Sequence, residues 1–92
     1  MHALTDEELI RLVAQGDRSA MQVIFARHHV RVFRFLVRLA RNEATADDIV
    51  SEVFIDVWRQ AGRFEGRSSV TTWLLSIARF KALSALRKRT DQ

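Results

Sequence analysis

Aromatic, cationic and hydroxyl side chains gather in the short segment Phe64-Glu65-Gly66-Arg67-Ser68-Ser69. An aromatic ring can stack on an unpaired base, hydroxyl and backbone groups can read the edges of that base, and an arginine can bind phosphate. Because many loops have such a composition, the segment alone gives only a hypothesis of nucleic-acid binding. Its candidate residues are Phe64, Gly66, Arg67, Ser68 and Ser69.

The residues that follow continue this pattern at helical spacing. We expect the core side of this helix to consist of Val70, Leu74, Ile77, Ala78 and Leu86. The side chains that point outward or border the core are Trp73, Arg79, Phe80, Lys81, Arg87, Lys88 and Arg89. Single-stranded nucleic acid needs such a mixture, with ring faces for bases and cations for the backbone. Trp73 fits a core position equally well, and the cluster at 87–89 also fits a solvated helix end whose cations suit the dipole.

No group of residues predicts catalysis or metal binding. Ser68 and Ser69 lack a His–Asp system that would activate a hydroxyl. His28 and His29 are adjacent, so they point about 100° apart on a helix and do not suit one metal ion, and His2 lies at the N-terminus. The chain has no cysteine, which excludes disulfides and thiolate zinc sites and fits a reducing cytosol. We therefore expect a protein that acts by binding, without a cofactor, rather than an enzyme.

The charge divides the chain into two parts. The 92 residues suffice for one domain, and their net charge is +4. From Arg63 onward, seven basic residues face two acidic ones, whereas residues 43–56 contain five acidic residues and no Lys or Arg. This division indicates two different partners, although ordinary surface charge is an alternative. No apolar run is long enough for a membrane helix, so we expect no membrane insertion.

Local signals predict four helices. Thr5 and Glu8 form a capping box, and Gly16 ends the first, short helix. Asp17 begins a second helix that runs to about Arg41. Its predicted core side comprises Met21, Ile24, Phe25, Val32, Phe35, Leu36 and Leu39. Its opposite side carries Arg27, Arg31, Arg34, Arg38 and Arg41, which fit either a solvated face or a site for an anionic partner.

The third and fourth helices follow two further breaks. After a break at 42–44, Thr45 with Asp48 predicts the start of a helix that runs to about Ala61 and is closed by Gly62. Ser68 or Ser69 then begins a helix from Val70 to Arg89. These elements predict an all-α fold, a compact bundle of one short and three longer helices.

One apolar residue of the third helix lies on its acidic side. At about 100° per residue, the core stripe comprises Ala46, Ile49, Val50, Val53, Phe54, Val57 and Ala61, with Trp58 at its edge. Ile55 falls among the opposite residues, which are Asp48, Ser51, Glu52, Asp56 and Arg59. Single exposed apolar residues are common. The alternative that we favour is an interface with a basic helical partner, in which Ile55 is the anchor and the carboxylates set the register.

These residues together resemble the second conserved region of sigma factors. The resemblance is carried by Asp48-Ile49-Val50-Ser51-Glu52-Val53-Phe54 with Trp58, by Phe64-x-Gly66-x-Ser68, by Thr72-Trp73-Leu74 with Ile77-Ala78-Arg79, and by Ala82-Leu83 with Ala85-Leu86-Arg87. The last three motifs, with Asp6-Glu7-Glu8-Leu9 and Gly16-Asp17, are similar to the extracytoplasmic-function group. The match covers nearly the whole chain in collinear order.

The resemblance implies partners and a role for each surface. Residues 64–69 would capture a flipped non-template base of the −10 element, and Trp73, Arg79, Phe80, Lys81, Ser84 and Arg87 would line the path of melted DNA. Asp48, Ser51, Glu52 and Ile55 would meet the clamp helices of the polymerase β′ subunit. An anti-sigma factor is a further possible partner, and the compartment would be the bacterial cytoplasm. No chemistry is implied, because binding the extruded base would stabilise the open duplex.

The sequence departs from the family pattern at three positions and in its extent. Ser51 replaces a usual glutamine, Phe80 a frequent asparagine and Ser84 a frequent aspartate. The promoter preference of relatives therefore does not carry over to this chain. The domain that reads the −35 element is absent, so we expect residues 1–92 to be the region 2 domain of a longer protein.

Two other classes of function remain as alternatives. A helix-turn-helix module would place a recognition helix in the major groove of intact duplex DNA. A protein-only module would bind polymerase or an anti-sigma factor without contacting DNA. The coexistence of the Ile55 face with the aromatic and basic tail favours the sigma-factor interpretation.

Overall fold

The computed structural model describes residues 3–90, with side chains as far as Lys88. Four helices, α1 (Asp6–Ala14), α2 (Arg18–Ala40), α3 (Glu43–Gln60) and α4 (Val70–Thr90), are joined by short connections, and a 3₁₀ turn (Ala61–Arg63) extends α3. Within this described part there is no strand, so the predicted all-α bundle of one short and three longer helices is confirmed. His2 and Asp91 lie outside it, as does the side chain of Arg89 that we expected to point outward.

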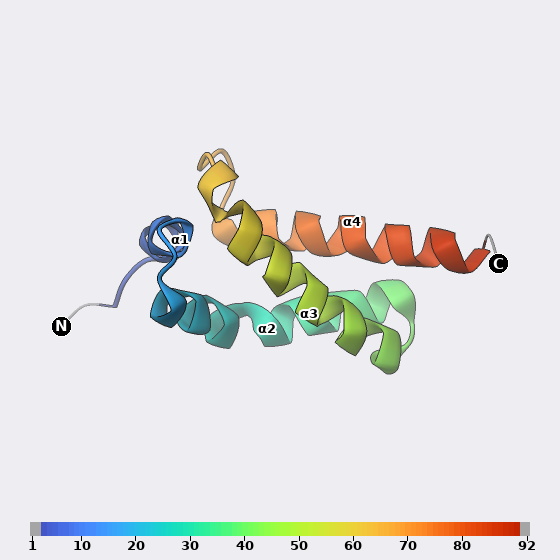
Figure 1. Cartoon of the computed structure of the whole chain (residues 1–92). Helices are drawn as coiled ribbons and strands as arrows, with labels where there is room; N and C mark the ends of the chain where they lie inside the picture. The colour runs from blue at the N-terminus through green and yellow to red at the C-terminus, as the bar shows by residue number, and fades with distance from the viewer. Residues whose placement is uncertain (1–2, 91–92) are drawn as a thin grey trace.

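The two longest helices give the molecule its elongated shape. Figure 1 shows α2 and α4 running lengthwise, with α3 running diagonally across both and α1 set across one end. The principal extents are 49 × 23 × 22 Å. Within the described residues, no helix combines the length and the apolar character that crossing a bilayer would need.

The start of α1 and its end follow the predicted local signals. Thr5 Oγ1 accepts from the Glu8 backbone N–H at 3.1 Å, and Glu8 Oε1 accepts from the Thr5 N–H at 2.9 Å. Gly16 has a φ of +89°, where a side chain would be strained. The Gly16 N–H donates to Val13 and the Asp17 N–H to Leu12, which together form a Schellman motif. The short helix is therefore fixed at both ends by backbone geometry.

The predicted start of α3 at Thr45 is wrong. The cap is Asn42, whose Oδ1 accepts from the Thr45 N–H at 3.0 Å, and the helix begins at Glu43. Arg41 adopts a left-handed conformation with φ of 55°, so the chain reverses between α2 and α3 within two residues. Gly62 does not close α3 either, because it lies inside the 3₁₀ turn.

The core forms where α2, α3 and α4 meet. The α3 stripe is as predicted, since Ala46, Ile49, Val50, Val53, Phe54, Val57 and Ala61 are all buried. From α4, Val70, Leu74, Ala78 and Ala82 are buried, while Ile77 and Leu86 are only partly so. From α2, Ile24, Val32 and Leu36 are buried, but Phe25, which we expected in the core, is 42% exposed. The small side chains of Ala78 and Ala82, one turn apart, let this part of α4 approach its neighbours closely.

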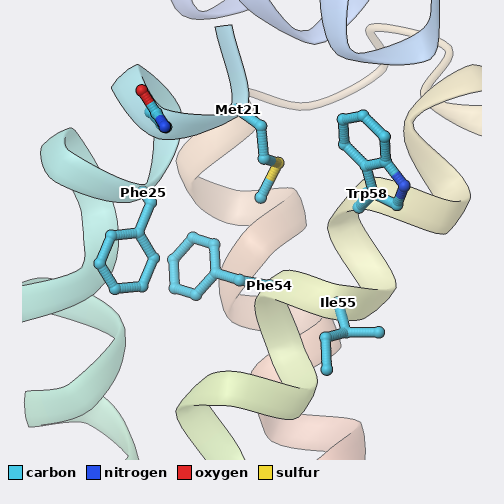
Figure 2. Close-up of a pocket in the computed structure, with 6 residues that line it drawn as sticks. Met21, Phe25, Phe54, Ile55 and Trp58 are labelled. Carbon is cyan, nitrogen blue, oxygen red and sulfur yellow. The ribbon is translucent and has the colours of Figure 1, made fainter. Parts of the chain in front are cut away.

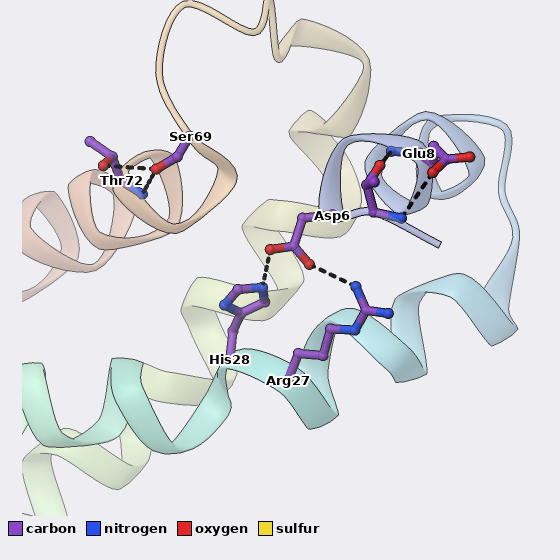
Figure 3. Close-up of polar contacts among 7 residues, drawn as sticks. Asp6, Glu8, Arg27, His28, Ser69 and Thr72 are labelled. Atoms are coloured by element: carbon purple, nitrogen blue, oxygen red, sulfur yellow. Dashed lines mark hydrogen bonds and ion pairs between the residues drawn. The ribbon is translucent and has the colours of Figure 1, made fainter. Parts of the chain in front are cut away.

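Polar contacts hold α1 against α2. Asp6 accepts from His28 Nε2 at 2.9 Å and from Arg27 Nη1 at 3.1 Å (Figure 3). His28 is 7% exposed and sits among the core residues of α2. Its ring thus forms a partly buried hydrogen bond that connects the first helix to the bundle.

Candidate nucleic-acid and protein interfaces

The loop between the 3₁₀ turn and α4 borders a small, open pocket. Its volume is about 240 Å³, and its lining comprises Arg63, Phe64, Glu65, Gly66, Arg67, Ser68 and Trp73. The rings of Phe64 and Trp73 lie 5.1 Å apart between centroids and are tilted by 51°. Gly66 has a φ of +74°, so a glycine is what this turn of the loop requires. Five of the candidate DNA-binding residues therefore surround one cavity with two aromatic rings in its wall.

Trp73 contributes to both the core and the pocket. It is half-buried and packs against the hydrophobic core, and its ring also faces Phe64. The two alternatives for Trp73 therefore do not exclude each other, because a large ring can bury one edge and present the other.

Ser69 fixes where α4 begins. Its Oγ accepts from the Thr72 N–H at 3.1 Å and donates to Thr72 Oγ1 at 3.0 Å (Figure 3). Of the two predicted caps, Ser69 is thus the one the structure uses, while Ser68 Oγ donates to the Ser69 carbonyl at 3.2 Å. Arg67 and Glu65 form an ion pair at 2.9 Å, with side chains 87% and 65% exposed. Such an exposed pair contributes little, so Arg67 can exchange Glu65 for phosphate.

The other α4 candidates differ in their surroundings. Phe80 is 69% exposed, which is unusual for so large an apolar ring. Arg79, Arg87 and Lys88 are exposed, and Ser84 is partly buried. Lys81 instead forms an ion pair with Asp56 of α3 at 2.9 Å. The pocket and the exposed side of α4 will be called the loop–helix surface.

The acidic face of α3 is open to solvent around Ile55. Ile55 is 48% exposed, and Asp48, Ser51, Glu52 and Arg59 are exposed as well. Asp56 differs, because its side chain is only 17% exposed and binds Lys81. These six residues will be called the α3 surface, with Asp56 at its edge toward α4.

An apolar groove that the sequence did not reveal adjoins Ile55. Figure 2 shows Ile55 and Trp58 on α3 facing Met21 and Phe25 of α2 across Phe54. The groove has a volume of about 380 Å³ and is lined by these residues and Gln22. Phe25 packs edge-on against Phe54, with centroids 5.0 Å apart, and stacks on His29 at 4.6 Å. We call the groove lined by Met21, Gln22, Phe25, Phe54, Ile55 and Trp58 the aromatic groove. It extends the apolar area around Ile55 well beyond a single side chain.

A second hollow continues from the aromatic groove along α2 and α3. It has a volume of about 540 Å³ and shares Phe25 with the first, and its lining includes Phe33, Val50 and Ser51. A larger exposed apolar area next to charged residues is typical of a protein-binding surface.

His28 and His29 have separate hydrogen-bond partners within the protein. His28 binds Asp6, while His29 Nδ1 donates to the Phe25 carbonyl at 2.9 Å. Among the residues that the structure describes, no group of three potential ligands could hold a metal ion.

Fold and surfaces define a helical binding domain with one aromatic and basic side and one acidic and apolar side. The Sigma-70 region 2 family profile matches residues 24–92. The chain therefore belongs to the Sigma-70 region 2 family, a family of transcription initiation factors rather than enzymes. The resemblance carried by its motifs is thereby confirmed.

Individual relatives are extracytoplasmic-function and other sigma factors. The chain is 42% identical to the sigma factor CarQ of Myxococcus xanthus over 72 residues, covering 78% of this chain and 41% of the relative. It is 38% identical to SigX of Bacillus subtilis over 71 residues, covering 77% and 37% respectively. The chain thus spans about two fifths of the length of these relatives.

One solved structure matches nearly the whole fold. It is an engineered region 2 of sigmaE in complex with GTAAAA, with a TM-score of 0.87 and 28% sequence identity. The match covers 98% of this chain and 95% of that one.

Proposed function

We propose that residues 1–92 form the region 2 domain of a bacterial, cytoplasmic extracytoplasmic-function sigma factor. In this role the domain binds RNA polymerase and recognises and melts the −10 promoter element. The observation that carries the proposal is the pocket of Phe64 and Trp73 beside the cations of α4. It occurs in a fold that matches a region 2 solved with GTAAAA.

The loop–helix surface has the parts needed to capture one unstacked base. Phe64 and Trp73 supply ring faces, and stacking on such rings contributes roughly 1–3 kcal/mol per base. This is comparable with the few kcal/mol that unstacking and unpairing cost. Gly66 and Ser68 present backbone and hydroxyl groups to the pocket, whereas the Ser69 hydroxyl is used in the cap of α4. Arg67 is exposed enough to bind phosphate. The pocket therefore stabilises the melted state without chemistry.

The exposed side of α4 then guides the melted non-template strand. Phe80 offers a second stacking face, and Arg79, Arg87 and Lys88 provide cations for the backbone. Lys81 and Ser84 lie beside this path, but Lys81 is held by Asp56. Its charge therefore contributes less to DNA binding than the charges of Arg79, Arg87 and Lys88, which form no ion pair within the described residues.

The α3 surface is where we expect the β′ clamp helices to dock. Ile55 would enter the partner's apolar seam, while Asp48 and Glu52 face basic residues and fix the register. The aromatic groove supplies the pocket that a central anchor of a helical partner needs. An anti-sigma factor, where one exists, would act by covering these same surfaces.

Three binding measurements on the 92-residue chain test the proposal. The probes are single strands and matched duplexes containing GTAAAA or a randomised window, and a β′ clamp-helix fragment. We expect the single strand to bind more tightly than the duplex, although its affinity for the isolated domain should be weak and should fall steeply with salt. We also expect the clamp fragment to bind. Preference for the duplex would indicate a helix-turn-helix module. Clamp binding without any DNA binding would indicate a protein-only module.

A further inference from the structure

The arginines of α2 line a groove that neither proposed surface uses. The groove has a volume of about 440 Å³ and lies between α2 and Leu75 of α4. Arg27, Arg31, Arg34 and Arg38 surround it, and Phe35 and Leu75 supply apolar surface. No carboxylate belongs to this lining. We call it the arginine groove.

Within the described residues, only one of these four charges is paired with a carboxylate. Arg27 binds Asp6 at 3.1 Å. Arg31, Arg34 and Arg38 form no ion pair with any residue in the described range 3–90. Like charges three and four residues apart repel on a helix. The three guanidinium groups therefore produce an uncompensated positive field that favours an anionic ligand.

The arginine groove also adjoins the helix that we assign to DNA. Leu75 contributes to its wall, and Arg79, which is exposed, lies one turn further along the same side of α4. The basic area thus continues from α2 onto α4. Phe35 and Leu75 can support the aliphatic stems of the arginines while their heads remain in water.

We propose that the arginine groove binds backbone phosphates of the duplex DNA that adjoins the melted segment, an inference that rests on the proposed function. Arginine suits this ligand because its planar guanidinium forms paired hydrogen bonds to phosphate. Residues 31 to 38 span about 10 Å of helix axis. One DNA strand presents a phosphate every ~3.4 Å of its axis, so the row matches about three of them. An acidic protein segment would explain the charge but not the continuity with Arg79.

The test compares two double variants with the same change in net charge. Arg31→Gln/Arg38→Gln alters the groove, whereas Arg11→Gln/Arg18→Gln removes two exposed arginines elsewhere. The DNA probes are a single strand and a fork in which this strand adjoins twelve or so base pairs of duplex. Affinity is measured from 50 to 300 mM salt, and circular dichroism verifies folding.

We expect the groove variant to lose about tenfold in affinity for the fork and about two units of salt slope, since each duplex phosphate contact contributes about 0.9. Its affinity for the single strand should stay within about twofold, and the control variant should resemble wild type on both probes. Equal losses in both variants, an unchanged salt slope, or an equal loss on the single strand would overturn the proposal. The proposal would also be overturned if wild type bound an acidic helical peptide and the groove variant lost this binding but kept its affinity for the fork. If wild type prefers duplex to single strand, the proposed function fails, yet a groove-specific loss on the fork would still support this contact.

Discussion

Lys81 Nζ and Asp56 Oδ2 lie 2.9 Å apart, so an ion pair joins the helix assigned to DNA to the helix assigned to polymerase. The two side chains are 27% and 17% exposed, and they are therefore less screened by water than an ordinary surface pair. The two surfaces are thus connected by the packing of α3 against α4 and by this pair.

A double-mutant cycle with Asp56→Asn and Lys81→Gln should give a coupling free energy of about 1 kcal/mol in urea unfolding. The matched control is the exposed pair of Glu65 and Arg67, for which we expect no measurable coupling. A coupling free energy near zero for Asp56 and Lys81, no larger than that of the control pair, would mean that this ion pair does not stabilise the fold.

Ile55→Glu should weaken binding to the β′ clamp helices by at least about tenfold, because it places a charge at the apolar centre of the α3 surface. The control is Val23→Glu on α2, which introduces the same charge at a residue 39% exposed that does not line the aromatic groove. Fluorescence anisotropy with a labelled clamp fragment measures both. Unchanged clamp binding by Ile55→Glu would contradict the assignment of the α3 surface to polymerase binding.

Ser69→Ala should lower the free energy of unfolding by about 1 kcal/mol, because it removes the cap of α4. For a domain of this size the melting temperature would fall by roughly 4–8 °C. Ser68→Ala, which leaves that cap in place, should change stability by less than ~0.5 kcal/mol. Similar melting temperatures for the two variants would contradict the assignment of Ser69 as the cap.

The capping box of α1 should make stability depend on pH in the acid range. Hydrogen bonds from the Thr5 backbone and side chain hold the pKa of the Glu8 carboxyl below its ordinary value. A group whose pKa is lowered by folding stabilises the protein above its unfolded pKa, and this contribution disappears as pH falls through the folded value. Glu8→Gln keeps a cap of similar shape but does not titrate.

Urea unfolding at pH 6 and pH 3 measures this contribution. The free energy of unfolding of wild type should exceed that of Glu8→Gln by a larger amount at pH 6 than at pH 3. Glu7→Gln, the same charge change at an exposed residue outside the capping box, serves as the control. A difference that stays constant between the two pH values for Glu8→Gln would rule out the lowered pKa.

Features set by neighbouring residues could be predicted from the sequence. Thr5 and Asp17 are caps, Gly16 ends α1, and Ile55 stands apart from the buried stripe of α3. Each depends on contacts within a turn or on the 3.6-residue period. Asn42 could also have been recognised, because asparagine caps helices at least as well as threonine.

Features that depend on how helices cross could not be predicted in this way. The buried residues of α2 recur every four positions from Ala20 to Leu36, and such a row drifts around the helix by about 40° per step. Whether Phe25 is covered therefore depends on where α3 crosses, and so does the aromatic groove. The partner of His28 is Asp6, 22 residues away, which no local pattern indicates.

The capture of one base by the pocket of Phe64 and Trp73 is the central claim, and an abasic scan tests it most directly. A single strand selected from a randomised six-nucleotide window is compared with versions that lack one base at a time and with its matched duplex. We predict that one position dominates, with a loss of about tenfold or more when its base is removed, and that the duplex binds more weakly. Equal small losses at every position, or a duplex that binds as tightly as the single strand, would contradict base capture.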